Sequence, residues 1–339
     1  MTSKYIEEII ENEFQRVTTM NSDASVADGA MGVALFMAWY GRKYDKTKYI
    51  EKCFYLIESR CLNLTAGDAL DFHKGQVGIA MGIVWLSLSN EICTPVADVL
   101  RQVDDNIFKH VTARLNNIEK KHVGTLIDIA YYLALRLQSH SFDCIDSKIY
   151  AKLLSKIINT IYPSFYDTLF QEVFPGGYSY NLPRFIFLIA NSFGNGFDNR
   201  LNHIIEELQP YVISQVPYMM SNRLALANAI YMLTRKKSIH YRWIKHVSLL
   251  VNSIDVEDFK DEYRTNQLSL YNGMSWFAFQ MLILKKYGIE FNHELYNLVK
   301  MKLDYSSFVK MEHDELVARG FVGLYGILGF LFIYLNFQE

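Results

Sequence analysis

Three residues carry side chains that can move protons without a metal ion. Asp71 and His73 stand two residues apart, and Tyr180 lies at the start of a later apolar segment. A carboxylate, an imidazole and a phenol can each donate or accept a proton during a reaction. These residues are therefore candidates for metal-independent acid–base catalysis. An isolated histidine is also commonly a hydrogen-bonded structural residue, so both interpretations stay open for His73.

A second set combines aromatic, amide and cationic side chains, which are typical of surfaces that contact organic ligands. Its members are Tyr180, Arg184, Asn222, Tyr271, Asn272 and Arg319. Arginines offer charge-assisted hydrogen bonds to carboxylates, and tyrosines can stack on planar groups. The set predicts a binding site for a peptide segment. The arginines could equally be buried and paired with acidic residues.

These residues must be positioned by a repeat, because each lies at or near the start of one of seven similar apolar segments. The clearest copies begin Gly29-Ala-Met-Gly32, Gly75-Gln-Val-Gly78 and Gly320-Phe-Val-Gly323, and weaker copies begin at Gly124, Asn181, Asn222 and Gly273. Successive copies are about 41 to 57 residues apart. A period of that size indicates an array of supersecondary units, each of which needs its neighbours to bury its apolar face.

The stretches between the apolar segments are charged and amphipathic. They cover residues 46–59, 98–118, 147–161, 199–213, 240–254 and 292–303. Their apolar residues recur at i, i+3, i+4 and i+7, which predicts helices with one wet face. Strand signals are nearly absent. We therefore expect an all-α protein of seven helical hairpins, each with an outer amphipathic helix and an inner apolar helix.

The last apolar segment suggests how the array ends. An open helical array needs polar caps at both ends, whereas residues 320–338 contain no charged residue. Ring closure accounts for this better, since the seventh inner helix would pack against the first. The sequence thus predicts a closed (α/α)7 toroid that forms a single domain over residues 1–339. The same segment is long enough to span a bilayer, but its phase with the other six favours a buried helix.

Composition restricts the class of partner and the compartment. The 339 residues include 34 basic and 36 acidic side chains, for a net charge of −2, and no basic stripe stands out. This argues against nucleic-acid binding. The first residues lack the apolar core of a secretory signal. Cys53, Cys61, Cys93 and Cys144 show no close pairing, so we expect small buried hydrophobes in a reducing cytoplasm.

The sevenfold Gly-x-x-Gly hairpin pattern resembles the lanthionine synthetase C-like family, and the resemblance covers essentially the whole chain. It implies an (α/α)7 toroid. The family's enzymes add peptide cysteine thiols to dehydroalanine or dehydrobutyrine, using a zinc ion. Its zinc ligands come from a Trp-Cys-x-Gly motif that opens the fifth repeat and a Cys-His-Gly motif that opens the sixth. Here those ligand positions are Met220, Tyr271 and Asn272.

None of these three residues can replace a cysteine or histidine ligand, so the resemblance implies a chain without a metal or other cofactor. The family's His-Gly at the fourth repeat falls on Tyr180-Asn181. The family also has an aspartate four residues before a repeat glycine. Asp71 has that spacing, but in the second repeat rather than the third, where Lys120 stands.

The resulting interpretation is a zinc-free, degenerate relative of this family. Without zinc to form a thiolate, the family's thiol activation is lost. We expect the protein to bind a peptide substrate or a modifying enzyme in ribosomal-peptide modification. One alternative is a metal-independent enzyme that uses Asp71, His73 and tyrosines. Another is a glycosidase-like α/α ring acting on carbohydrate, which needs two carboxylates. Candidates for those are Asp68, Asp71, Glu312, Asp314 and Glu315.

Overall fold

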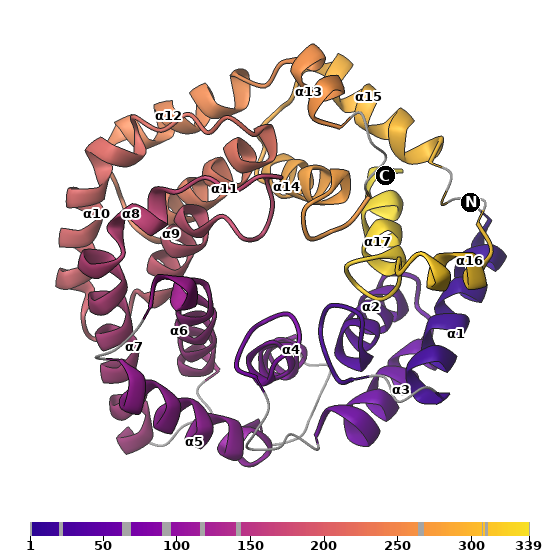
Figure 1. The fold of residues 1–339 in the computed structure, drawn as a ribbon, viewed down its shortest axis with the longest axis horizontal. Coiled ribbons are helices and arrows are strands. Elements are labelled where there is room, and N and C mark those ends of the chain that lie inside the picture. Colours follow the sequence, from indigo (N-terminus) through magenta and orange to yellow (C-terminus); the bar gives the residue numbers. More distant parts are fainter. Residues whose placement is uncertain are drawn as a thin grey trace. The chain divides into compact units, whose positions relative to one another are not determined.

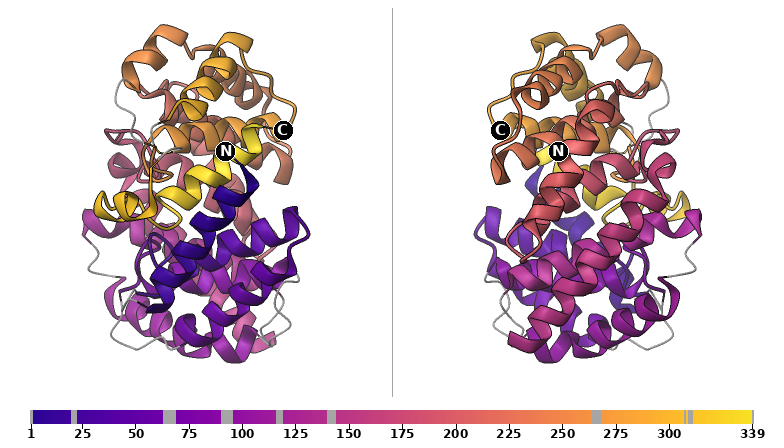
Figure 2. Two further views of the ribbon diagram at one scale, coloured as in Figure 1. Left: turned by 90° about the vertical axis from the view of Figure 1, so that its right-hand side faces the viewer. Right: turned by 90° about the vertical axis from the view of Figure 1, so that its left-hand side faces the viewer.

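Helices are the only extended secondary structure in the described part of the chain. The computed structural model describes residues 2–19, 23–62, 69–89, 96–115, 119–139, 144–263, 268–306, 308 and 311–338. Within these ranges no residue belongs to a strand, and both side views draw only coiled ribbons and loops (Figure 2). The all-α prediction is confirmed. Asp68 lies outside the described residues.

The chain divides into two compact units. The first comprises Met1–Ile157 and Phe308–Phe332, and the second comprises Ile158–Ser307 and Ile333–Glu339. The helices α7 (Cys144–Ser164) and α17 (Ile327–Phe337) each contribute residues to both units. The first unit therefore joins the early part of the chain to a segment from its last forty residues or so.

The first unit is built in two helical layers. Its apolar layer contains α2 (Ala30–Lys43), α4 (Gln76–Leu88) and α6 (Val123–Gln138), and its covering layer contains α1 (Ser3–Thr19), α3 (Thr47–Leu56) and α5 (Val96–Arg114). Shorter elements are η1 (Ile57–Cys61), η2 (Lys120–His122) and α16 (His313–Ala318). Helix α2 packs on α1, α3 and α4, and α4 packs on α5 and α6 (Figure 1). Apolar segments therefore pack against their neighbours in the repeat, as predicted.

The second unit repeats this arrangement. Its apolar layer contains α9 (Asn181–Ser192), α11 (Met220–Lys236) and α14 (Met274–Lys286), and around these lie α8 (Tyr166–Phe170), α10 (Asp198–Val212), α12 (Tyr241–Asn252), α13 (Val256–Glu262) and α15 (His293–Asp304). Helix α11 packs on α9, α12 and α14 (Figure 1). It is the central apolar helix of this unit, and the candidate site lies at its start.

Three apolar helices begin on a glycine with nearly the same backbone. Gly29, Gly75 and Gly273 precede α2, α4 and α14 with φ of −100°, −99° and −104°. This extended conformation is open to any residue, so close approach of the chain must explain the glycine. A Cβ on Gly29 would lie 2.4 Å from the Asp23 carbonyl oxygen, and one on Gly75 would lie 2.3 Å from that of Ala69. The starts of α2 and α4 thus have no room for a side chain.

The register predicted for the seventh repeat is wrong. Gly320 was expected to open the last apolar helix, but α17 begins at Ile327. Gly320 and Gly323 have φ of +66° and +65°, which is the left-handed region that favours glycine. The residue that precedes α17 is Gly326, which with Gly329 forms another Gly-x-x-Gly pair. Glycines spaced by three residues make the motif fit in more than one register.

Only part of the uncharged C-terminal segment is helical. Helix α17 has only 11 residues, because residues 320–326 form turns before it. Among the residues that the structure describes, no helix combines the length and apolar character needed to cross a membrane. This agrees with the expectation of a buried helix.

A buried ion pair joins the two layers of the first unit. The Arg136 guanidinium donates to an Asp104 carboxylate oxygen at 2.6 Å, and the Tyr132 hydroxyl donates to the other oxygen at 2.6 Å. Arg136 and Tyr132 are fully buried and Asp104 nearly so. Burial, followed by the charge of Asp104, holds the pKa of Tyr132 well above its ordinary value. Such a network requires one arrangement of α5 on α6, because any slip would leave a buried charge unpaired.

Candidate functional site

The structure places five of the six predicted ligand-contacting residues in the second unit. Tyr180, Arg184, Asn222, Tyr271 and Asn272 come from the starts of α9, α11 and α14, whereas Arg319 belongs to the first unit. The starts of α9 and α14 each adjoin that of α11, since α11 packs on both helices. These five residues therefore form the candidate site.

A single irregular segment, residues 171–180, connects α8 to α9 and runs over the starts of the next two apolar helices. We call it the crossing segment. The Gly177 amide donates to the side-chain oxygen of Asn222 at 3.2 Å, and the Tyr178 amide donates to the Tyr271 carbonyl oxygen at 2.9 Å. A Cβ on Gly177 would lie 2.6 Å from that same carbonyl oxygen. Glycine is needed here because the two backbones nearly touch.

The ring of Tyr178 lies among three other side chains. The Arg184 guanidinium carbon stands 4.5 Å from the ring centroid, the usual distance of a cation–π contact. The rings of Trp276 and Tyr271 lie with centroids 6.1 Å and 6.3 Å away. All four residues are half-buried, so part of each faces solvent. We call Tyr178, Arg184, Tyr271 and Trp276 the Tyr178 cluster.

Polar groups around this cluster are partly satisfied within the protein. The hydroxyl groups of Ser179 and Tyr271 hydrogen-bond to each other, and Arg184 donates to the Asn181 side-chain oxygen at 3.1 Å. The indole nitrogen Nε1 of Trp276 is buried and finds no hydrogen-bond partner among the described residues. A buried N–H donor without an acceptor is costly.

Two carboxylates from the chain itself occupy the amino end of α11. Glu172 of the crossing segment accepts the backbone amides of Tyr218 and Met219 at 2.8 Å and 2.7 Å. The same carboxylate accepts the Asn222 side-chain amide at 3.0 Å. The first amides of a helix lack partners within it and attract anions. Glu172 therefore sits where an external carboxylate would be favoured.

The second carboxylate comes from α13. Glu262 accepts the Met220 amide at 2.7 Å and the Ser221 hydroxyl at 3.3 Å. Free amides at helix starts favour anions. The amides do hold anions at α11, but the anions are side chains of the protein.

Burial separates the predicted ligand-contacting residues into two kinds. Tyr180 is 1% exposed and Asn222 is 0% exposed. The Asn222 amide is shared between Gly177, Glu172 and the Val173 carbonyl, so it holds the crossing segment in place. Burial, and secondarily Glu172, raises the pKa of Tyr180 above its ordinary value. The side chains that can reach an incoming ligand are those of Arg184, Tyr271 and Asn272, which are half-buried.

The positions at which the resembled family holds zinc carry no metal-binding set here. Met220 is 1% exposed and lies in the first turn of α11. Throughout the described part of the chain, no three His, Cys, Asp or Glu side chains stand close enough to hold an ion together. Cys53 and Cys61 are buried in the first unit, and burial raises the pKa of Cys61 to about 12. The side chains of Cys93 and Cys144 lie outside the described residues.

The proposed acid–base residues Asp71 and His73 lie in the loop before α4. The Asp71 carboxylate accepts the backbone amides of His73 and Lys74 at 2.9 Å and 2.8 Å, an arrangement that stabilises a turn. The Nδ1 atom of His73 hydrogen-bonds to the hydroxyl of Tyr325. The structure therefore joins His73 to a tyrosine 252 residues away, and gives Asp71 a role in the backbone of the turn.

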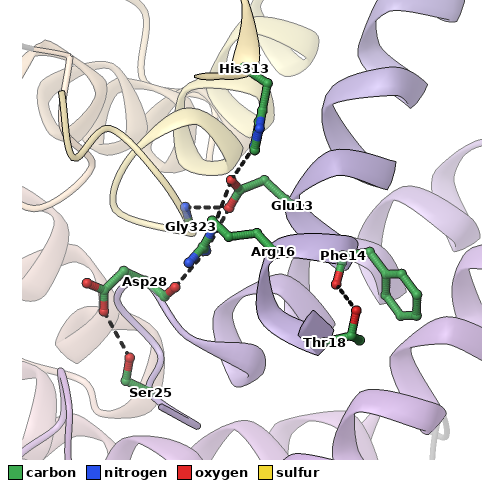
Figure 3. A network of polar contacts seen from close by, with 8 residues as sticks. All are labelled: Glu13, Phe14, Arg16, Thr18, Ser25, Asp28, His313 and Gly323. Atoms are coloured by element: carbon green, nitrogen blue, oxygen red, sulfur yellow. Dashed lines mark hydrogen bonds and ion pairs between the residues drawn. The ribbon is translucent and has the colours of Figure 1, made fainter. Parts of the chain in front are cut away.

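A second polar network in the first unit fixes the loops before α2 and α17 (Figure 3). Glu13 of α1 is fully buried. Its carboxylate accepts hydrogen bonds from Arg16 at 2.9 Å, from His313 at 2.9 Å and from the Gly323 amide at 2.8 Å. Arg16 also donates to the Asp28 carbonyl oxygen at 2.7 Å. Helix α1 thus ties together segments from both ends of the chain.

The protonation of Glu13 follows from these partners. Burial alone would raise the pKa of this carboxyl group. Hydrogen bonds from His313, Arg16 and Gly323, together with the charge of Arg16, outweigh burial and hold the pKa below its ordinary value of 4.5. Glu13 is therefore charged at neutral pH.

Arg319 does not stand at a helix start. It follows α16 and pairs with Glu315 one turn earlier, at 2.7 Å, with its side chain 54% exposed. The sequence placed it beside the seventh apolar helix because that helix was expected to open at Gly320.

Comparison with known proteins identifies no family for this chain. No model of a known protein family matches the chain, and a search of curated proteins finds no significant relative. The fold and the site described above are therefore the basis for assigning a function.

Proposed function

We propose that the protein is a metal-free binding protein with the lanthionine synthetase C-like architecture, a closed ring of seven helical hairpins. In this proposal it binds a peptide substrate or a partner enzyme during ribosomal-peptide modification. The binding site comprises Arg184, Tyr271, Asn272 and Trp276, which lie at the starts of α9 and α14 beside the start of α11.

The proposal rests on the residues that stand where the lanthionine synthetase C-like family binds zinc. Tyr271 stands there as part of a half-buried group of three aromatic rings and one arginine. Aromatic side chains and arginine are enriched among the residues that dominate binding energy, and aromatic rings offer large contact areas with few rotatable bonds.

The ring architecture is supported by the positions of the helices. Apolar helices start within two residues of the predicted position at Gly29, Gly75, Gly124, Asn181, Asn222 and Gly273. In each unit successive apolar helices pack on one another. A crystal structure that showed an open array, or six hairpins, would contradict the ring.

Peptide binding is tested by titration with a synthetic precursor-type peptide that has an acidic leader and a core rich in Ser, Thr and Cys. We expect wild-type protein to bind it and a Tyr271→Ala, Arg184→Ala double variant to bind at least tenfold more weakly, which corresponds to about 1.4 kcal/mol. A matched control is Tyr305→Ala, because Tyr305 is 84% exposed in the same unit. Equal affinities for wild type and the double variant would rule out this site.

A second candidate function is metal-independent proton transfer at His73, favoured by its hydrogen bond to Tyr325. In this case a peptide thiol would lose its proton to the imidazole, the sulfur would add to the β-carbon of a dehydroalanine, and the proton would return to the α-carbon. Loss of free thiol, measured by alkylation and mass spectrometry, would report turnover. Loss in wild type but not in His73→Gln would favour this function, and no loss in either would exclude it.

A further inference from the structure

The crossing segment makes the contacts that a bound peptide would make. We propose that residues 171–178 are a tethered ligand that occupies the starts of α11 and α14, and that an external peptide of the same chemistry competes with them. That chemistry is a carboxylate followed, six residues later, by an aromatic residue preceded by two glycines. The inference rests on the proposed peptide-binding function and specifies both its ligand and its regulation.

The first contact is a set of hydrogen bonds to a carboxylate. Glu172 is the acidic residue of the segment, and it accepts three hydrogen bonds from Tyr218, Met219 and Asn222 at 2.7 to 3.0 Å. Hydrogen bonds to a charged acceptor are about twice as strong as those between neutral groups. The amino end of α11 adds the favourable field of the helix dipole. A carboxylate is therefore the natural anchor at this end of the site.

The second contact is made by the backbone. The amides of Gly177 and Tyr178 donate to Asn222 and to the Tyr271 carbonyl, as an added peptide strand would. Neither glycine tolerates a side chain. A Cβ on Gly176 would lie 2.2 Å from the Ser221 hydroxyl oxygen, and one on Gly177 would lie 2.9 Å from the Asn272 Cα. The site thus requires two small residues before the aromatic one.

The third contact is aromatic. The Tyr178 ring is held by Arg184, Tyr271 and Trp276 and stays partly exposed to solvent. The segment is also open four residues earlier, at Phe174. Phe174 is 65% exposed, and its ring lies 6.1 Å from that of Tyr218, which is 76% exposed. One side of the segment therefore faces water over much of its length, and this allows an external peptide to displace it stepwise.

Tethering explains how a segment with so few contacts can stay bound at the starts of α11 and α14. A ligand on the same chain acts at an effective concentration of about millimolar, so a free peptide at micromolar concentration competes poorly. The apparent affinity for a free peptide falls in proportion to the fraction of molecules whose site is open. Loosening the segment without altering its receptor residues should therefore raise affinity for the peptide.

The experiment supplies the segment in trans. A fluorescein-labelled peptide with the sequence of residues 171–180, Gln-Glu-Val-Phe-Pro-Gly-Gly-Tyr-Ser-Tyr, is titrated into wild type and two variants, and binding is followed by anisotropy. Gly177→Val forces the tethered segment away from Tyr271, and Tyr178→Ala removes its ring from the cluster. Both changes leave Asn222, Tyr271 and Trp276 intact.

We expect both variants to bind the peptide at least tenfold more tightly than wild type does. A peptide carrying valine in place of its second glycine is the matched control and should not bind. Melting curves show whether each variant is folded, and Tyr178→Ala decides the matter if Gly177→Val is not.

Two results would overturn the inference, and each leaves the proposed function separately testable. Equal affinity for wild type and folded variants would mean that the segment does not compete. No binding to either folded variant would mean that the segment is not a ligand mimic. The precursor-type peptide, titrated into wild type in parallel, then decides whether peptide binding itself survives.

Discussion

The backbone amide of Tyr178 donates to the carbonyl oxygen of Tyr271 at 2.9 Å, although the two residues precede different helices, α9 and α14, with α11 between them in the chain. In a repeat array each unit normally contacts only its immediate neighbours. Here the segment before the fourth apolar helix, α9, contacts the loop before the sixth, α14, and passes the start of the fifth, α11. This departure from the repeat pattern lies at the candidate site of the second unit.

The first prediction concerns the anchor of the crossing segment. Glu172→Ala should lower the free energy of unfolding by about 1–3 kcal/mol, because two backbone amides and the Asn222 amide lose their acceptor. Chemical denaturation measures the change. Glu206→Ala, at an exposed position on α10, is the control and should change stability by less than about 0.5 kcal/mol. Equal effects of the two changes would show that Glu172 is not an anchor.

The second prediction concerns pH. The folded-state pKa of Glu13 lies below its ordinary value of 4.5, so its charge contributes stability that is present above pH 4.5 and is lost as pH falls through the folded pKa. Glu13→Gln should therefore cost about 3 kcal/mol near pH 5.5 and progressively less toward pH 3.

Urea unfolding of wild type and Glu13→Gln at several pH values measures this difference. A stability difference that stays constant from pH 5.5 to pH 3 would mean that Glu13 is not held charged by Arg16 and His313. Glu8→Gln, at an exposed position on the same helix, provides the matched control.

The third prediction compares two glycines with the same backbone conformation. Gly320 and Gly323 have φ of +66° and +65°, but a Cβ on Gly320 would meet no atom within 4 Å, whereas one on Gly323 would lie 2.4 Å from the Asp28 Cα. Alanine at either position carries the cost of a left-handed backbone, about 1 kcal/mol. Gly323→Ala should lose a further 1–3 kcal/mol or so by overpacking. Equal melting temperatures for the two variants would refute the close contact.

The fourth prediction concerns metal content. Met220, Tyr271 and Asn272 offer no zinc-binding set, so purified protein should hold far less than one zinc ion per chain by elemental analysis. Dialysis against a chelator should leave the melting temperature unchanged, whereas proteins with structural zinc lose stability when it is removed. About one zinc ion per chain that survives dialysis would overturn this prediction.

Much of the fold was predictable because helix starts leave a local signature. The pairs that begin with Gly29 and Gly75 mark helix starts correctly, since chain crowding there excludes a side chain. The same signature fails at the seventh repeat. Glycines at 320, 323, 326 and 329 satisfy Gly-x-x-Gly in three registers. Only the left-handed backbone of Gly320 and Gly323 shows that the helix does not start at either of them.

The site was less predictable because its key contacts are not local. Tyr271 and Arg184 were found through their place in the repeat. Glu172 and Glu262 were missed because they lie well before a repeat start and look like ordinary surface acids in sequence. Tyr325 was missed as the partner of His73 because 252 residues separate them. Nothing in the repeat indicates which distant side chains meet.

The first unit has a consequence for the order in which the protein can mature on the ribosome. Glu13 receives a hydrogen bond from Gly323, 310 residues later in the chain. At a synthesis rate of 5–20 residues per second, roughly 15–60 s pass between the emergence of the two residues. During that time the Glu13 carboxylate of α1 lacks its hydrogen-bond donors Gly323 and His313. The loop that completes the contacts of α1 is thus made 310 residues after Glu13, and the nascent first unit stays incomplete until that loop has been synthesised.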